Sequence, residues 1–372
     1  MMTKKLPCLE KTDGRWQLTV DGRPMLLFSG ELHNSSASSA EYMDEQVWPY
    51  LRPLHMNAVI LPVYWQLLEP REGEFDFSLV DALIGQARRE GVRLVLLWFG
   101  LWKNGESTYA PDWVKLDQER FFWARDSHGQ AIFTISPFCE EAVSADARAF
   151  ARLMRHIRET DQAEQTVVMI QLENEIGTLG IARDYSEAAQ RAFEAEVPAV
   201  MPGACGTWAA SYGEQAPIYL MEYAYASAVE RIARAGQAEY ALPMFVNAWL
   251  EKFPWRPGTW PCGCPVARFI PVWQACAPSV AFTAPDVYVS DFAGVCEAYT
   301  AHDNPLFIPE HRQDLEHMSD ALYAYGMGAL CFAPFGLEDF FTPLPEGLPY
   351  DCRQQALANR KTALPDVGAY LA

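Results

Sequence analysis

Short apolar segments alternate with helical or loop segments along most of this chain. Eight of the apolar segments have the length of β-strands, at residues 25–30, 58–63, 92–98, 166–172, 244–247, 279–283, 306–308 and 328–334. Helical patterns lie between or after them, at residues 40–55, 79–90, 140–158, 186–197, 218–235, 267–277, 292–299 and 315–326. Strands that alternate with helices form a parallel sheet, and eight such units suggest a closed barrel. The sequence therefore predicts an α/β fold, a (β/α)₈ TIM barrel.

The N-terminal segment predicts a β-hairpin before the first barrel strand. An Asp21-Gly22 turn between two apolar runs predicts an N-terminal β-hairpin that leads into strand one. An open doubly wound sheet is the rival fold, but it would carry a Gly-rich phosphate turn after strand one, and residues 30–34 read Gly-Glu-Leu-His-Asn. We therefore expect one catalytic barrel domain over residues 1–372, with a last helix in residues 354–372.

The charge balance narrows the possible partners. The chain has 29 basic and 48 acidic residues, a formal net charge of −19. Nucleic acids and anionic membranes would repel such a surface, so neither is expected as a partner.

No apolar run approaches the ~20 residues that span a bilayer, and no secretory leader is visible, which favours the cytoplasm. Nothing in the sequence specifies an oligomeric state.

The nine cysteines are scattered and odd in number, as expected of free thiols. Cys262-Gly-Cys264 with a distant Cys276 has poor spacing for zinc. We therefore expect no metal and no cofactor.

Two glutamates follow strand-like segments directly. Glu175 comes after residues 166–172, and Glu310 comes after residues 306–308. Glutamate disfavours strands and is costly to bury unpaired. Strand ends meet at one face of a barrel, where two carboxyl groups could flank a glycosidic bond, one giving a proton and one attacking the sugar. The alternative is that both pair with surface arginines such as Arg312.

The neighbour Glu173 complicates the choice of acid. Side chains alternate along a strand with period two, so Glu173 and Glu175 share a face in an extended chain. Glu175 is favoured because it lies further toward the barrel mouth.

Several motifs resemble those of one enzyme family. Residues 171–177, Gln-Leu-Glu-Asn-Glu-Ile-Gly, are similar to the Q-V-E-N-E-Y-G motif of family 35 glycoside hydrolases. Residues 29–33 resemble S-G-x-x-H, residues 63–70 resemble V-x-W-N-x-H-E-P, and residues 73–77 resemble G-x-F-D-F. The resemblance covers about residues 22–336. It implies a retaining, exo-acting enzyme that releases terminal β-linked galactose from oligosaccharides by double displacement.

The same resemblance implies roles for individual residues. Glu175 matches the acid/base and Glu310 the nucleophile. Asn174 matches a residue that hydrogen-bonds the sugar 2-hydroxyl, and Tyr288 matches a tyrosine that orients the nucleophile. Tyr64, Trp249 and His33 complete the expected sugar-binding set, although a structural role is as plausible for His33.

The chain departs from the family pattern after strand three. Trp102-Lys103-Asn104 stands where typical members have a cysteine-alanine-glutamate segment. A bacterial branch with W-K-N is more similar, and its members usually carry a further C-terminal β-domain, which we expect to be absent here. We expect the three residues to border the pocket; the alternative is that they brace the loop to Pro137. A β-glucosidase, a β-arabinosidase and an inactive carbohydrate-binding barrel stay open as alternative functions.

Overall fold

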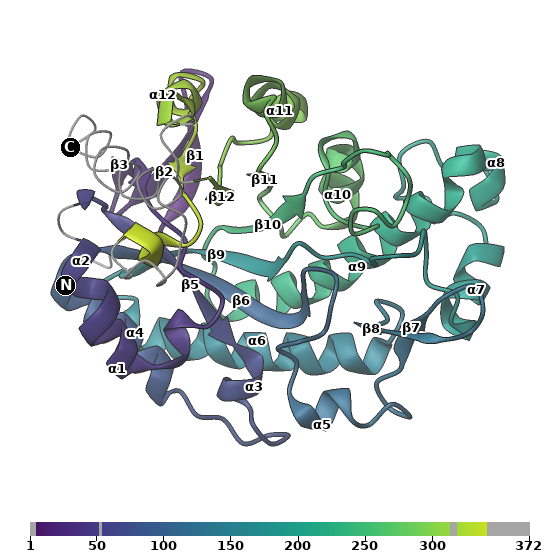
Figure 1. The fold of residues 1–372 in the computed structure, drawn as a ribbon, viewed down its shortest axis with the longest axis horizontal. Coiled ribbons are helices and arrows are strands. Elements are labelled where there is room, and N and C mark those ends of the chain that lie inside the picture. Colours follow the sequence, from purple (N-terminus) through teal and green to yellow (C-terminus); the bar gives the residue numbers. More distant parts are fainter. Residues whose placement is uncertain (1–4, 52–53, 313–317, 341–372) are drawn as a thin grey trace, which may run out of the picture.

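The core of the protein is a ring of parallel strands (Figure 1). The computed structural model describes residues 5–51, 54–312 and 318–340. Six strands are hydrogen-bonded in the order β12-β11-β10-β9-β6-β5, and β13 and β4 form a parallel pair. Their bounds are β4 (Leu27–Phe28), β5 (Ala58–Tyr64), β6 (Arg93–Lys103), β9 (Val167–Asn174), β10 (Met244–Trp249), β11 (Phe282–Val287), β12 (Glu310–His311) and β13 (Cys331–Phe332).

Isolated bridges join the strand pair to both edges of the six-stranded sheet. Ile308 bridges to Phe332 on one side, and Glu31 bridges to Ile60 on the other, both in parallel. The eight strands therefore follow one another around the ring in chain order. The predicted barrel is confirmed. The helix expected in residues 354–372 lies outside the described residues.

Helices cover the outside of the ring. The longer ones are α4 (Ser78–Glu90), α6 (Glu140–Asp161), α7 (Glu187–Glu194), α9 (Ala216–Glu239), α10 (Ile270–Cys276), α11 (Phe292–Tyr299) and α12 (Met318–Gly326). Short turns are α1 (Ala40–Tyr42), a π-helical turn (Met43–Val47), α2 (Trp48–Leu51), α3 (Trp65–Leu68), α5 (Asp112–Lys115) and α8 (Trp208–Tyr212). Helices α6 and α9 pack against each other along one side of the sheet (Figure 1). Because helices cover the strands, β5 and β9 are buried along their whole length.

The N-terminal hairpin is present, with one strand more than predicted. β2 (Arg15–Val20) pairs with β3 (Arg23–Met25) across the Asp21-Gly22 turn, and β1 (Cys8–Thr12) pairs with the other edge of β2. The chain then enters the barrel at β4.

Several predicted bounds were wrong. Strand seven was expected at residues 306–308, but β12 spans Glu310–His311, and two further differences bear on the barrel mouth. Residues 99–137 were expected as one loop, but β6 continues to Lys103, and β7 (Trp123–Arg125) pairs with β8 (Ala131–Ile135). Strand six was expected at residues 279–283, but β11 spans Phe282–Val287 and includes Asp286. Both strands therefore carry polar side chains further toward the barrel mouth than predicted.

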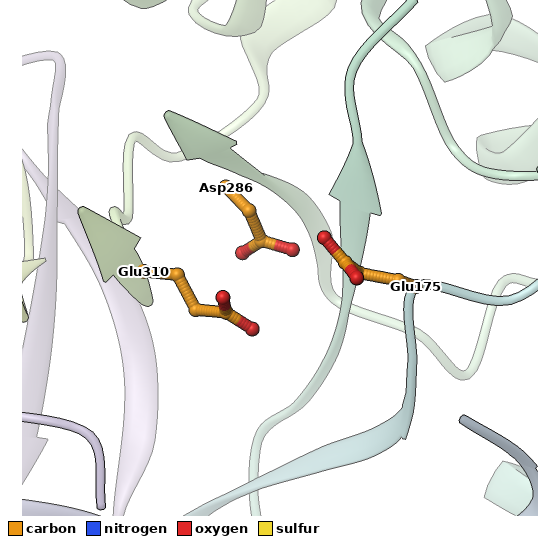
Figure 2. Close-up of side chains that lie close together, drawn as sticks. All are labelled: Glu175, Asp286 and Glu310. Atoms are coloured by element: carbon orange, nitrogen blue, oxygen red, sulfur yellow. The ribbon is translucent and has the colours of Figure 1, made fainter. Parts of the chain in front are cut away.

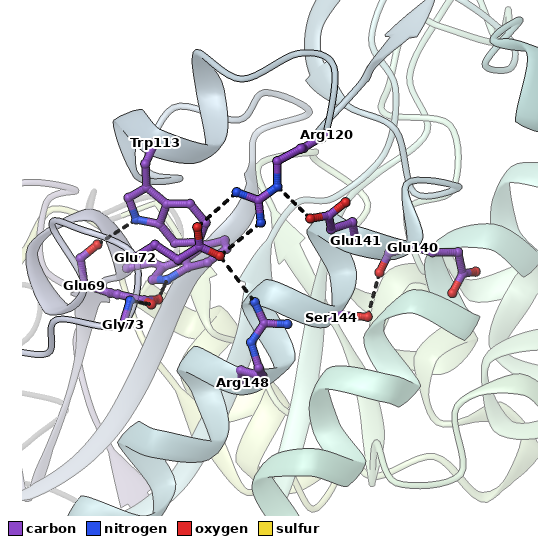
Figure 3. A network of polar contacts seen from close by, with 10 residues as sticks. Glu69, Glu72, Gly73, Trp113, Arg120, Glu140, Glu141, Ser144 and Arg148 are labelled. Atoms are coloured by element: carbon purple, nitrogen blue, oxygen red, sulfur yellow. Dashed lines mark hydrogen bonds and ion pairs between the residues drawn. The ribbon is translucent and has the colours of Figure 1, made fainter.

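A network at the barrel edge secures the loop after α3 (Figure 3). The Glu69 carboxylate accepts hydrogen bonds from the Trp65 indole (2.7 Å) and the Gly73 backbone N–H (2.7 Å). Outside it, Arg120 forms two hydrogen bonds of 3.0 Å with Glu72 and one of 2.7 Å with Glu141. Glu69 of the 63–70 motif therefore fixes the shape of this loop, and Glu72 and Arg120 link the loop to Glu141 on α6.

The eight cysteines among the described residues are free thiols, as predicted. Within the described ranges, no helix combines the length and the apolar character needed to cross a membrane.

Candidate active site

A cavity of about 470 Å³ opens where the strands end at the barrel mouth. Six of the predicted site residues line it: Lys103, Asn104, Glu175, Trp249, Tyr288 and Glu310. The other lining residues are Asn34, Leu250, Lys252, Asp286, Val289 and Phe335. The pocket is therefore built from the carboxyl ends of the strands and the loops that follow them, as expected for a barrel.

Three carboxyl groups converge in this pocket (Figure 2). Asp286 and Glu310 are register partners on neighbouring strands, and Glu175 follows β9 directly. One oxygen from each of the three groups lies within 4.8 Å of the others. Carboxyl groups this close attract protons or a cation. The absence of a metal and a cofactor stays a prediction.

The backbone at the end of β9 separates Glu175 from Glu173. Both residues have positive φ angles, 58° at Glu173 and 44° at Glu175, which are uncommon for non-glycine residues. The extended geometry that alternates side chains is lost there, so the prediction that the two glutamates share a face was wrong. Glu173 is fully buried and accepts the backbone N–H groups of Leu101 (3.2 Å) and Trp102 (2.8 Å). Only Glu175 lines the cavity.

Gly177 completes this bend. Its φ is +134°, and a Cβ placed there would lie 2.6 Å from the backbone carbonyl carbon of Pro261. The glycine of the 171–177 motif is therefore required by close approach of two backbones.

Asparagine side chains hold Glu175 in place. The Asn104 amide donates to the Glu175 carboxylate at 2.6 Å, and the Glu175 backbone N–H donates to the Asn247 side-chain oxygen at 2.8 Å. The Asn247 amide donates to Asp286 (2.7 Å) and more weakly to Asn174 (3.3 Å). Asn174 is fully buried beneath the pocket, and the cavity lining does not include it.

Glu310 has a separate partner. The Tyr288 hydroxyl donates to its carboxylate at 2.8 Å, and Arg312 donates to the Tyr288 backbone carbonyl at 2.7 Å. Arg312 thus supports the tyrosine through its backbone. The adjacent His311 is buried and contacts Asp320 at 3.2 Å, so its ring serves the outer side of the strand.

Burial and like charge shift the pKa values of these acids upward. The pKa of Glu175 rises to about 8, mainly because of burial and then because of the nearby Glu310 charge, against the opposing charge of Lys103. Burial also raises the pKa of Glu310, while Lys103 and the Tyr288 hydrogen bond act in the opposite direction. The pKa of Asp286 lies well above its ordinary value, again mainly through burial and then through Glu310. The site therefore holds protons that exposed carboxylates would release.

Besides Asn174, three further predicted residues are absent from the cavity lining. Trp102 is buried, donates its indole N–H to the Ile135 carbonyl (2.8 Å), and therefore braces the loop as the alternative reading proposed. Tyr64 is buried beside the ring of Phe99. His33 contacts Asp339 (3.0 Å) and meets the edge of Phe335, which itself lines the pocket.

Asp286 and Asn247 are site residues that the sequence patterns did not predict. Asp286 shows the same signal as the two glutamates, an acid at the end of an apolar strand, but strand six was placed too early to reveal it. Asn247 is a polar residue inside the apolar strand β10.

Comparisons with known proteins identify the family of this chain. A model of the glycosyl hydrolases family 35 matches residues 17–211. A beta-galactosidase of Xanthomonas manihotis is 32% identical over 102 residues, 24% of this chain and 17% of that protein. Beta-galactosidase BbgII of Bifidobacterium bifidum is 24% identical over 181 residues, 48% of this chain and 25% of that protein. The matched segments thus span a quarter or less of these relatives.

Solved structures share the fold. A beta-galactosidase from Bacillus circulans sp. alkalophilus superposes with a TM-score of 0.63 at 11% identity, covering 92% of this chain and 55% of that one. The catalytic domain of a beta-amylase from Paenibacillus polymyxa reaches 0.63 at 13% identity, covering 90% of this chain and 99% of that one. These likenesses establish the barrel architecture of glycosidases. Because the family match spans more than half of the 372 residues, this chain is a glycoside hydrolase that belongs to family 35.

Proposed function

We propose that the chain is a retaining, exo-acting β-galactosidase that releases terminal β-linked galactose from oligosaccharides. One observation carries the mechanism: oxygens of Glu175 and Glu310 lie within 4.8 Å of each other. Retaining glycosidases hold their carboxyl groups ~5–5.5 Å apart, whereas inverting ones leave ~6.5–9.5 Å for a water molecule. The short separation favours direct attack on the sugar.

In this mechanism Glu310 is the nucleophile and Glu175 the acid/base. Glu310 attacks the anomeric carbon as a carboxylate, with Tyr288 and Lys103 stabilising its charge. Glu175 gives its proton to the departing oxygen, and its pKa of about 8 keeps it protonated at neutral pH. Once Glu310 is esterified, its charge is gone. The pKa of Glu175 then falls, and Glu175 accepts a proton from the incoming water.

The walls of the pocket support binding of a terminal sugar. Lys103 and Asn104 present hydrogen-bond donors, and Trp249 presents an apolar face of the kind that packs on sugar C–H groups. Galactose as the sugar is supported by the relatives named beta-galactosidases. A β-glucoside or β-arabinoside is the nearest alternative, and an inactive carbohydrate-binding barrel is a third possibility.

A panel of nitrophenyl glycosides tests all three functions. The β-galactoside should be the best substrate, and the first sugar released should be the β-anomer when the reaction is followed by proton NMR. A different best glycoside would replace galactose and keep the mechanism. Release of the α-anomer would exclude retention, and no release from any glycoside would leave only carbohydrate binding.

A further inference from the structure

Asp286 is a third carboxyl group in the pocket without a place in the two-carboxylate mechanism. It is 2% exposed, and one of its carboxyl oxygens lies within 4.8 Å of an oxygen of Glu175. Asn247 donates to Oδ2 at 2.7 Å. Oδ1 is buried, and none of the described residues donates an N–H or O–H to it.

Two carboxyl groups can share a hydrogen bond only if one of them carries a proton. Like charges at this distance cannot both ionise in a buried site. Asn247 marks Oδ2 of Asp286 as the accepting oxygen, which leaves Oδ1 as the atom that can hold the proton. Whenever Glu175 has given up its proton, Asp286 is therefore the donor and the Glu175 carboxylate the acceptor.

The surrounding charges favour the same assignment. The acids that face Asp286 are Glu175, Glu310 and Glu31, and all three raise its pKa. The cations of the pocket, Lys103 and Lys252, act on Glu175, and Lys103 acts also on Glu310 and Glu31. The nearby Tyr288 donates to Glu310. Neutral Asp286 relieves the repulsion among these acids.

We propose that Asp286 is a positioning residue that stays protonated through the reaction and donates a hydrogen bond from Oδ1 to the Glu175 carboxyl group. The inference rests on the proposed function and assigns one more residue of the same site. As the glycosidic bond breaks, the Glu175 proton moves to the leaving oxygen and a bond forms between Glu310 and the anomeric carbon. The new Glu175 carboxylate then accepts the Asp286 hydrogen bond. When water attacks, Glu175 takes a proton from it, the Glu310 ester bond breaks, and Asp286 is unchanged.

Two substitutions test whether Asp286 acts as a neutral hydrogen-bond donor to Glu175. Asp286→Asn keeps a neutral donor, because its carbonyl can accept from Asn247 while its amide faces Glu175. Asp286→Ala removes the donor. Because a donor stabilises the charged form of Glu175, Asp286→Ala should move the alkaline limb of kcat/KM upward by roughly one pH unit. It should also slow turnover of the glycosyl-enzyme about tenfold, seen as a burst with a good leaving group. Asp286→Asn should keep both properties close to those of the unmodified protein.

The assignment fails if Asp286→Asn moves the alkaline limb downward, because that result means the substitution removed a negative charge. It also fails if Asp286→Asn and Asp286→Ala lose the same activity at every pH. Thermal unfolding of both variants, with EDTA present throughout, excludes loss of folding or of a bound cation as the cause.

A titration without substrate keeps the test independent of the proposed function. In full-length protein labelled with ¹³C at carboxyl carbons, the Glu175 signal should titrate alike in the unmodified protein and in Asp286→Asn, and at higher pH in Asp286→Ala. An unshifted Glu175 signal in Asp286→Ala overturns the inference. If the titrations match expectation but no glycoside is cleaved, the proposed function fails and the proton assignment stands.

Discussion

A single residue separates Glu173 from Glu175, and each lies near a second buried acid in a different region of the barrel. Glu173 and Asp146 both accept the Leu101 N–H (3.2 and 2.9 Å), and Asp146 also accepts from the Trp98 indole (2.8 Å). Glu175 and Asp286 have carboxyl oxygens within 4.8 Å of each other, and both line the open cavity. The first pair is enclosed by donors from β6, and the second has an oxygen without a protein donor. Access to the cavity therefore separates a structural acid pair from one that can do chemistry.

Gly100 makes the enclosed pair possible. A Cβ at this position would lie 2.4 Å from Asp146, 2.5 Å from the Trp98 indole nitrogen and 2.7 Å from Glu173. The missing side chain lets the β6 backbone approach the two acids and donate to them. The same strand then presents Lys103 and Asn104 to the pocket, so the enclosed pair supports the open one.

Removal of the nucleophile should have the largest effect on the open site. We expect Glu310→Gln to lower kcat/KM at least ~10⁴-fold, because loss of a covalent nucleophile removes the whole pathway. Glu297→Gln, at an exposed position of α11, is the matched control and should leave kcat/KM unchanged. Retained activity in Glu310→Gln would remove Glu310 from the mechanism.

Exchanging the two neighbouring glutamates for glutamine tests the comparison directly. Glu175→Gln should lower kcat by ~10²–10⁴-fold on substrates with poor leaving groups and less at the glycosylation step of good ones, which need little protonation. The unmodified protein should lose kcat/KM as the pH rises through about 8, where Glu175 loses its proton. Glu173→Gln should lower stability without any dependence on the leaving group. The reverse pattern would assign the acid to Glu173.

Asn104 should matter less than either glutamate. Its amide donates to Glu175 at 2.6 Å, and a hydrogen bond to a charged group is worth ~1.5–3 kcal/mol, or roughly 10–100-fold in kcat/KM. Asn104→Ala should also flatten the preference between galactoside and glucoside. Asn104 has a φ of 52°, so Asn104→Gly serves as a second variant without backbone strain. A loss in the alanine variant alone would indicate strain.

The enclosed pair should change stability with pH and leave the chemistry intact. Burial raises the pKa of Asp146 from 3.8 to about 6, so the folded state binds more protons than the unfolded state between these values. Stability is then lost as the pH rises through that window, by at most ~3 kcal/mol. Asp146→Asn cannot ionise, so its free energy of unfolding should gain on that of the unmodified protein between pH 4 and pH 7. Urea unfolding at both pH values measures the gain, and a constant difference would contradict the pairing.

Much of this protein follows from local sequence patterns. Alternating strands and helices predict the closed barrel, because parallel strands need crossover helices and eight units suffice to close the ring. Glu310 and Glu175 stand out in the sequence because each lies near the end of an apolar strand, and strand ends meet at the barrel mouth. The Asp21-Gly22 hairpin follows from turn chemistry alone.

Other features depended on contacts between distant segments. Positive φ angles at Glu173 and Glu175 break the two-residue alternation, and no periodicity in the sequence records them. Trp102 was expected at the sugar but packs inward, because the Ile135 carbonyl accepts its indole N–H. Asp286 belongs to the site because β11 pairs with β12 in a register that sets Asp286 beside Glu310. The hydrophobic pattern of the sequence determines which residues lie at the end of a strand. The direction of a side chain and the protonation of a buried carboxyl group depend instead on neighbours that the fold brings together.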